Sequence, residues 1–373
     1  MEGDDTLKRL KACIKYGLFL LPGAAGLLLY LILPYFPALT ETVFSGFLFR
    51  LLSVPLGGLV SVLPLSLTEI TVVLALPVFA LLLTLWIRRM RRAANRRRLL
   101  ARSVRGVGWV VSSVFLIYML LHGANFYRLP VSDLMGLDTS MQSPEILQQV
   151  CIDLARKASA ERLSVEEDDQ GRMKLSQSKT ATLRLADNGY RNLQESLPFL
   201  WGGVWRAKPV QLSHWWSYTG ITGMYFPFYA EANVNIDIPD SSIPATAAHE
   251  LAHTRGFARE DECNFFAYLS SIHSNSADYR YSGYVLAYIY TSNALLGYDQ
   301  ELWSEARAYC SEGMLRDLAA QNRYWEQFEG EVQQVSSSIN NSFIAAQGDE
   351  DGVLSYDRVV QLILGYYIAE NMV

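Results

Sequence analysis

Three long apolar segments in the first third of the chain constrain the fold more than any other feature of the sequence. Residues 16–36, 70–87 and 107–126 carry no lysine, arginine, aspartate or glutamate. A helix needs roughly 20 apolar residues to cross the hydrocarbon core of a bilayer, and each segment is about that long. We therefore predict a membrane domain with three transmembrane helices that covers residues 1–128.

The charges around these segments predict the orientation of the chain. Residues 1–128 hold 15 Lys and Arg against 5 Asp and Glu, and nine of the arginines lie in the loop 88–105. Short cytoplasmic loops are enriched in Lys and Arg, so the N-terminus and this loop are predicted to face the cytoplasm. A basic loop between two apolar segments is typical of such a topology signal rather than of a nucleic-acid site. Three crossings then place residues 129–373 outside the cytoplasm, in a multi-pass protein of the cell membrane.

The chain between the first two apolar segments is less regular. Residues 40–66 are largely apolar but include Arg50 as well as proline and glycine residues. Two interpretations remain open, namely a re-entrant or interfacial membrane segment and an ordinary extracellular hairpin.

The rest of the chain, residues 129–373, has the composition of an acidic globular domain. It holds 17 Lys and Arg against 32 Asp and Glu, which argues against a nucleic-acid partner. The whole chain has four cysteines and no CxxC motif. Neither a disulfide framework nor a cysteine zinc site is therefore indicated.

The strongest chemical motif in this domain is HELAH at residues 249–253. On a helix His249 and His253 are four residues apart, so both imidazoles leave the same face and can bind one zinc ion. Glu250 lies beside the first histidine, where a carboxylate can take a proton from a water molecule at the metal. The spacing predicts a catalytic Zn²⁺ site with Glu250 as the general base.

A third metal ligand is expected a few residues further along. Gly256 can end the first helix in the left-handed conformation, and a second helix is expected to begin near Glu260. On that helix Glu260 and Asn264 share a face, whereas Glu262 points some 200° away. We therefore predict Glu260 as the third ligand and Asn264 as an amide that orients a ligand, with Glu262 as the reserve candidate.

Most of the chain after Asn264 has helical periodicity, while the region around 208–237 alternates β-branched and aromatic residues with glycines. Ser241 and Ser242 are candidate N-caps, with Pro244 in the first turn of the metal-binding helix. The predicted fold class is therefore α+β. A mostly helical extracytoplasmic domain with a small antiparallel sheet follows three transmembrane helices.

These features together resemble the bacterial membrane proteins grouped as domain of unknown function 3810. The resemblance rests on the three apolar segments, on ITGMYFPFYAEANVNI, and on HELAH followed by GFAREDECNF. It implies a membrane-anchored, zincin-like metallopeptidase fold. Glu260 and Asn264 are similar to the gluzincin pattern, in which a glutamate and then an acidic or amide residue four positions on follow HExxH. Metzincins carry a third histidine where this chain has Arg259.

The predicted activity is hydrolysis of peptide bonds in an envelope, secreted or membrane protein substrate. Zinc would activate the water, and Glu250 would be the general base and later the proton donor. The alternative is a catalytically inactive, zinc-stabilised membrane sensor or scaffold. Glu250 favours the enzyme, because a purely structural zinc site does not need this carboxylate.

Overall fold

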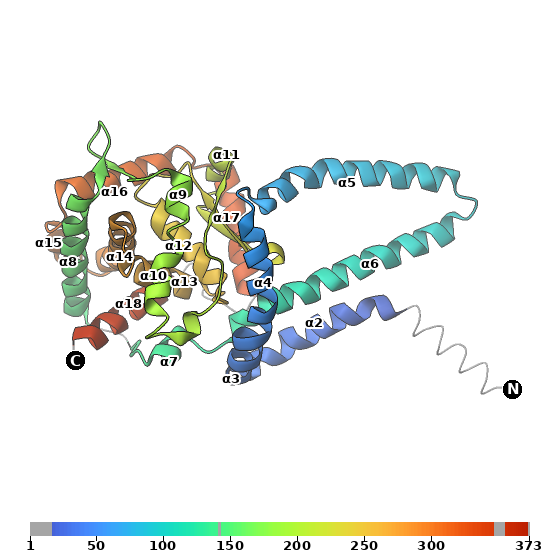
Figure 1. Cartoon of the computed structure of the whole chain (residues 1–373), viewed down its shortest axis with the longest axis horizontal. Coiled ribbons are helices and arrows are strands. Elements are labelled where there is room, and N and C mark those ends of the chain that lie inside the picture. Colours follow the sequence, from blue (N-terminus) through green and yellow to red (C-terminus); the bar gives the residue numbers. More distant parts are fainter. Residues whose placement is uncertain (1–16, 141–142, 347–354, 372–373) are drawn as a thin grey trace. The chain divides into compact units, whose positions relative to one another are not determined.

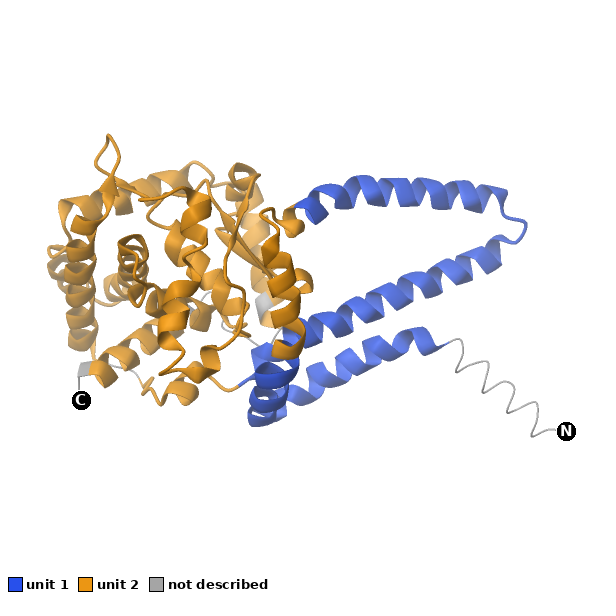
Figure 2. Ribbon diagram, viewed as in Figure 1, with its two compact units in different colours: residues 1–49, 70–128 blue, residues 50–69, 129–373 orange. Residues whose placement is uncertain are grey.

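The computed structural model describes residues 17–140, 143–346 and 355–371 of the 373-residue chain. The chain divides into two compact units, shown in Figure 2: unit 1 holds residues 1–49 and 70–128, and unit 2 holds residues 50–69 and 129–373. The basic N-terminal stretch and the first residue of the predicted span 16–36 lie outside the described residues.

Unit 1 is helical in the part that the structure describes. Its elements are η1 (Leu18–Leu20), α2 (Leu21–Ile32), η2 (Leu33–Tyr35), α3 (Pro37–Leu39), η3 (Thr40–Leu48), α5 (Leu67–Arg92, which begins in unit 2), α6 (Arg96–Leu121) and η4 (Gly123–Tyr127). Helix α2 packs on α6. Buried Arg128 pairs with Glu41 at 2.7 Å and so joins the end of this unit to η3.

Four helical stretches among the described residues are long and apolar enough to cross a membrane: Leu18–Tyr35, Pro37–Val62, Leu67–Arg92 and Arg96–Leu121. The first, third and fourth correspond to the three predicted spans, and their number and orientation remain predictions. Helices α5 and α6 extend into the arginine-rich stretch, so only residues 93–95 separate them (Figure 1).

Unit 2 is mostly helical, as predicted. Its elements are α4 (Phe49–Val62, whose first residue belongs to unit 1), α7 (Val131–Met135), α8 (Pro144–Glu161), η5 (Arg162–Ser164), β1 (Glu166–Glu167), β2 (Met173–Lys174), α9 (Lys179–Leu183), α10 (Asp187–Leu193), η6 (Pro198–Leu200), β3 (Lys208–Val210), α11 (Ser213–Ser217), β4 (Gly223–Phe226), η7 (Pro227–Tyr229), β5 (Glu231–Asn235), α12 (Ile243–His253), α13 (Glu260–Ile272), α14 (Ala277–Tyr298), α15 (Gln300–Arg307), α16 (Glu312–Glu326), α17 (Glu331–Ala346) and α18 (Ser355–Asn371). Residues 50–69, which the sequence placed with the membrane domain, group with this unit.

The larger sheet of unit 2 has the strand order β3-β5-β4. Strand β4 pairs antiparallel to β5, with Phe226 opposite Glu231, but β3 pairs parallel to β5, with Lys208 opposite Asn233. This sheet is therefore mixed, and the prediction of an antiparallel sheet holds for its β4–β5 pair and for the separate two-stranded sheet β1-β2. The difference arises because the chain returns from β3 through α11 and β4, a connection long enough to make the third strand parallel to the first.

Helix α12 lies at the centre of unit 2, packed against the sheet on one side and against α13 and α14 on the others (Figure 1). Its alanines and Leu251 are fully buried, as expected for a helix that is apolar nearly all round. Small side chains let the neighbouring elements approach closely, and the phenol of Tyr190 donates a hydrogen bond to the carbonyl of Ala248. Of the polar residues of this helix, Glu250 and His253 are therefore buried, whereas Thr246 and His249 are partly exposed.

Candidate metal centre

Helix α12 brings the two histidines of the motif onto one face. It begins at Ile243 after Ser242 and ends at His253, close to the predicted bounds, although the Ser242 side chain makes no capping hydrogen bond. Gly256 follows with a φ of +84°, the conformation that glycine adopts most easily and that ends the helix. The ring centroids of His249 and His253 are 5.0 Å apart.

Helix α13 supplies the carboxylate. It begins at Glu260, as predicted from the sequence. Glu260 Oε2 lies 3.1 Å from His249 Nε2, and Glu260 Oε1 lies 3.7 Å from His253 Nε2. One ligand atom from each of these three residues lies within 4.8 Å of the other two. Two imidazole nitrogens and a carboxylate oxygen form a donor set that zinc enzymes use, with a fourth position left for water or substrate.

The outer nitrogen of each imidazole is fixed by a hydrogen bond. His249 Nδ1 lies 2.8 Å from Asn264 Oδ1, and His253 Nδ1 lies 2.9 Å from the carbonyl oxygen of Phe257. Both partners accept, so each Nδ1 carries a proton and each Nε2 faces Glu260, where its lone pair can bind a metal once any proton on that nitrogen has left. Asn264 thus occupies the orienting position predicted for it.

Glu250 is held beside this group by close packing. Its side chain is buried, and no hydrogen-bond partner for Oε2 occurs among the described residues. Strand β4 passes directly over it, since a Cβ at Gly223 would lie 2.4 Å from Glu250 Oε1. Only glycine permits this approach. This buried carboxylate oxygen, without a partner among the residues that the structure describes, lies next to the three candidate metal ligands, where a carboxylate can reach water.

The pKa values of His249, His253 and Glu250 are shifted in different directions, and the causes differ. Burial lowers the pKa of both imidazoles, but the hydrogen bond and the charge of Glu260 outweigh burial at His249 and raise its pKa to about 9. At His253 burial prevails and lowers the pKa to about 4. Burial also raises the pKa of Glu250 to about 8, although the charge of His249 opposes it. In the metal-free protein a proton on His249 therefore balances the Glu260 carboxylate.

The reserve candidate Glu262 points away from the histidines. Its Oε1 accepts hydrogen bonds from the backbone N–H of Val131 and from the guanidinium of Arg259, and its side chain is buried. The structure thus brings together Glu260, His249 and His253, and it places Glu262 in a structural contact with the start of α7.

Two contacts of this group were not found from the sequence. Tyr225 stacks on His253 with a centroid distance of 5.9 Å, and the thiol of Cys263 lies 3.3 Å from His253 Nδ1. Gly223 and Tyr225 are two residues apart along β4, so they lie on the same face of the strand, and this face is turned toward α12. That spacing is the only sequence signal for Tyr225, and it does not reveal which helix the strand covers.

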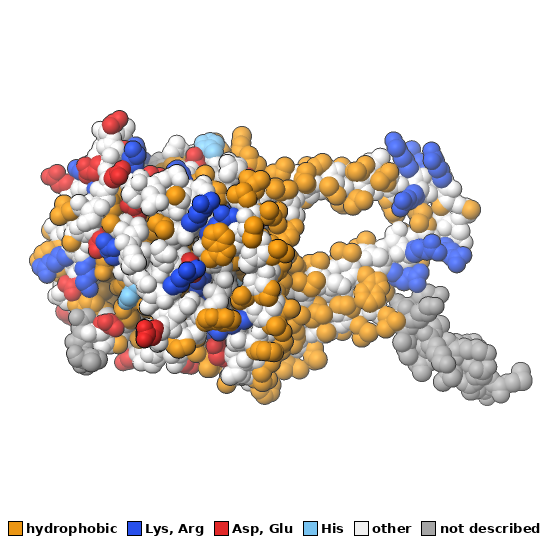
Figure 3. Space-filling model, viewed as in Figure 1, with side chains coloured by type: hydrophobic (Ala, Val, Ile, Leu, Met, Phe, Trp, Pro, Cys, Tyr) orange, Lys and Arg blue, Asp and Glu red, His pale blue; other side chains and the backbone are white. Residues whose placement is uncertain are grey.

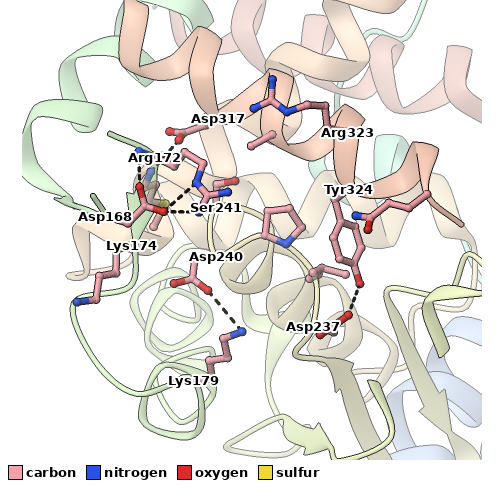
Figure 4. Close-up of a pocket in the computed structure, with 15 residues that line it drawn as sticks. Asp168, Arg172, Lys174, Lys179, Asp237, Asp240, Ser241, Asp317, Arg323 and Tyr324 are labelled. Carbon is pink, nitrogen blue, oxygen red and sulfur yellow. Dashed lines mark hydrogen bonds and ion pairs between the residues drawn. The ribbon is translucent and has the colours of Figure 1, made fainter. Parts of the chain in front are cut away.

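A separate cavity of about 380 Å³ lies near the N-terminal end of α12, and Figure 4 shows its lining. Its charges largely pair with one another: Arg172 bonds Asp168, Tyr324 donates to Asp237, and Lys179 lies 3.6 Å from Asp240. None of the three candidate ligands lines it. The cavity is therefore distinct from the metal centre.

The fold and the site define a class, a protein with several apolar helices and a mostly helical unit that carries an HExxH group. A family model described as "Protein of unknown function (DUF3810)" matches residues 44–364, and the chain belongs to this family. The match includes every residue of the candidate metal centre. No curated protein and no solved structure matches the chain.

Proposed function

We propose that this chain is a membrane-anchored, zinc-dependent metallopeptidase with a zincin-like catalytic unit. The convergence of His249, His253 and Glu260 on one point, with Glu250 beside them, is the observation that carries this proposal. Two neutral imidazole nitrogens and a carboxylate suit zinc. Glu250 Oε2 has no partner in the part of the chain that the structure describes, which fits a role toward water or substrate.

The residues of the chain divide the reaction among them. His249, His253 and Glu260 would hold the metal, which supplies Lewis acidity for the scissile carbonyl and for water. Glu250 accepts the proton of the attacking water and delivers it to the leaving amine. Asn264 and the carbonyl of Phe257 keep the imidazoles in the orientation and tautomer that the metal requires.

Strand β4 supports a peptide as the substrate. Among the described residues it pairs only with β5, so its other edge can pair with an extended chain. Gly223 and Tyr225 place this strand directly against Glu250 and His253. A peptide that added to this edge would run alongside the metal centre.

The arginine-rich stretch 88–105 favours a cytoplasmic location for the connection between α5 and α6. On that orientation unit 2 is extracytoplasmic. On that topology the substrates are envelope, secreted or membrane proteins. The acidic composition of residues 129–373 disfavours nucleic acid as a partner.

Zinc content tests the metal centre. The full-length protein, purified in detergent, is expected to hold about one zinc per chain, because the described residues form one three-ligand group. His249→Ala and His253→Ala should remove it. His214→Ala is the matched control, since this exposed histidine pairs with Asp237 away from the centre. Unchanged zinc in the His249→Ala and His253→Ala proteins would show that these residues do not bind the metal.

Glu250→Gln separates an enzyme from a zinc-stabilised sensor or scaffold. The variant should keep its zinc and its fold, because Glu250 is not one of the three ligands. If the protein is a peptidase, cells with this variant should release the same proteins as cells with the gene deleted. A release pattern identical to that of wild type would favour the scaffold instead.

A further inference from the structure

Helix α4 carries its large apolar side chains on its outward face, the reverse of a helix that is exposed to water. The face that packs onto the rest of unit 2 carries the small or polar residues Ser53, Gly57 and Ser61 together with Val60. The outward face carries large aliphatic side chains, namely Leu51, Leu52, Leu59 and Val62, of which Leu59 is 73% exposed and Val62 is 71% exposed. A helix in water buries its apolar face, so this arrangement indicates an apolar medium on the outer side.

The inner face of α4 is firmly attached to unit 2. A Cβ at Gly57 would lie 2.6 Å from Val204 Cγ1, so the helix and the chain around Val204 are in direct contact. Lys208, which is 2% exposed, donates to the carbonyl of Val60 at 2.9 Å, and Arg206 donates to the carbonyl of Leu63. The leucines therefore face outward as a consequence of specific contacts on the opposite side.

Aromatic and basic side chains border this outward face. Trp201 and Trp205 are both exposed, and they lie on the chain segment that packs against α4. The guanidinium of Arg50 lies 5.7 Å from the Trp201 ring centroid, and that of Arg206 lies 4.7 Å from the Trp205 ring centroid. Tryptophan and basic side chains next to an aliphatic surface are typical of the membrane–water boundary.

We propose that these side chains form a lipid face of unit 2, made of Leu51, Leu52, Leu59, Val62, Trp201 and Trp205, that inserts into the boundary region of a phospholipid bilayer. The leucines and Val62 would contact acyl chains, and the two tryptophans would lie among the headgroups. Figure 3 shows hydrophobic side chains gathered over α4.

The position of α4 in the chain selects lipid as the occupant. Helix α4 follows η3 directly, and α5 begins five residues after α4 ends. The stretches Leu18–Tyr35, before α4, and Leu67–Arg92, after it, are both apolar enough to cross a membrane, as is Pro37–Val62, which contains α4. Bilayer is therefore available on both sides of α4 in the sequence, and no second protein is needed to cover its outward face. The inference concerns this surface and does not depend on zinc or on catalysis.

Site-directed spin labelling of the full-length protein in phospholipid vesicles tests the lipid face. Cys151, Cys263 and Cys310 are buried, so a Cys13→Ser background leaves an added surface cysteine as the reactive thiol. Leu59→Cys probes the lipid face. Leu163→Cys is the matched control, an equally apolar residue of the same unit that is 87% exposed on η5. Circular dichroism and gel filtration establish that both variants fold.

The nitroxide at position 59 should collide several-fold more often with oxygen than with a water-soluble nickel complex, relative to the nitroxide at position 163. Val62→Cys should behave as Leu59→Cys does, and Pro55→Cys, on the same exposed side, provides an independent site. Equal accessibility to the nickel complex at positions 59 and 163 would show that the face lies in water. Low accessibility to both reagents at position 59 would show that protein covers it, and either result overturns the proposal.

Discussion

Two buried carboxylates of unit 2 differ in how completely the protein satisfies them. Glu231, at the start of β5, accepts from Lys208 Nζ at 2.6 Å, from the backbone N–H groups of Leu67 and Thr68, and from the Thr68 hydroxyl at 2.6 Å. Glu250 is also buried, but its Oε2 has no partner among the described residues. The first carboxylate joins segment 50–69 to the sheet, and the second is the one to which we assign the proposed general-base role.

The pKa values of the two carboxylates reflect this difference. Burial raises the pKa of both groups. At Glu231 this effect is outweighed by the hydrogen bond and charge of Lys208 and by the hydrogen bonds from Thr68. The pKa of Glu231 is therefore lower than its ordinary value. At Glu250 burial prevails and the pKa rises to about 8. Burial alone therefore does not distinguish a structural carboxylate from a reactive one, whereas the hydrogen-bond partners do.

Glu231→Gln should have the largest effect on stability. It leaves the Lys208 ammonium buried without a counter-charge, and breaking a buried ion pair in this way typically costs about 3–5 kcal/mol. We expect a large fall in the midpoint of thermal unfolding in detergent, with zinc still bound below that midpoint. Glu195→Gln, at an exposed position, is the control and should not change the midpoint. A similar midpoint for both variants would mean that the contacts of Glu231 do not stabilise the fold.

Glu260→Gln should have the largest effect on metal binding. It removes the only charged ligand, and we expect zinc affinity to fall by more than the roughly 100-fold upper range for residues that only support a ligand. Competition with a zinc chelator measures the loss. Glu262→Gln is the matched control in the same helical turn, and its zinc affinity should equal that of wild type because Glu262 bonds Val131 and Arg259. The reverse result would assign the ligand role to Glu262.

Asn264→Ala should weaken zinc binding by a smaller factor. It removes the acceptor of His249 Nδ1 and leaves the three ligands in place, so a loss of roughly 10–100-fold is expected. The same chelator competition measures it, and Asn264→Asp should retain most of the affinity because a carboxylate can also accept this hydrogen bond. An Asn264→Ala protein with wild-type affinity would show that the imidazole is oriented by packing alone.

The smallest expected effect, about tenfold for each pH unit, concerns pH. The pKa of His249 is raised to about 9 in the metal-free protein, so near neutral pH its proton must leave before zinc can bind. Zinc affinity should therefore rise with pH, by about tenfold per pH unit for one displaced proton, and should level off above pH 9. Calorimetric titrations in buffers of different ionisation enthalpy count the released proton. No proton release at pH 7 would indicate that His249 is already neutral.

Local spacing was enough to predict which side chains converge on one point. The four-residue repeat of a helix determines that His249 and His253 share a face, and the helix stop at Gly256 sets the start of α13 and so the side on which Glu260 and Asn264 lie. Those interactions join residues close together in the chain, where dihedral preferences decide the geometry.

Long-range packing could not be predicted in this way. Glu231 and Thr68 are 163 residues apart, and no periodicity links the segment after α4 to strand β5. The same holds for Gly223, whose approach to Glu250 depends on how β4 crosses α12. For the same reason residues 50–69 were placed with the membrane domain, since their composition is apolar and their contacts with unit 2 are invisible in the sequence.

Val204 links helix α4 to the metal centre. Its side chain lies against Gly57, and its backbone N–H donates to the hydroxyl of Thr254, the residue that follows His253. With the lipid face in the bilayer, this short connection sets a fixed height of the proposed scissile site above the membrane surface. For the peptidase proposed above, this geometry predicts cleavage of membrane-anchored proteins at a set distance from their membrane segment, with position more important than side-chain identity.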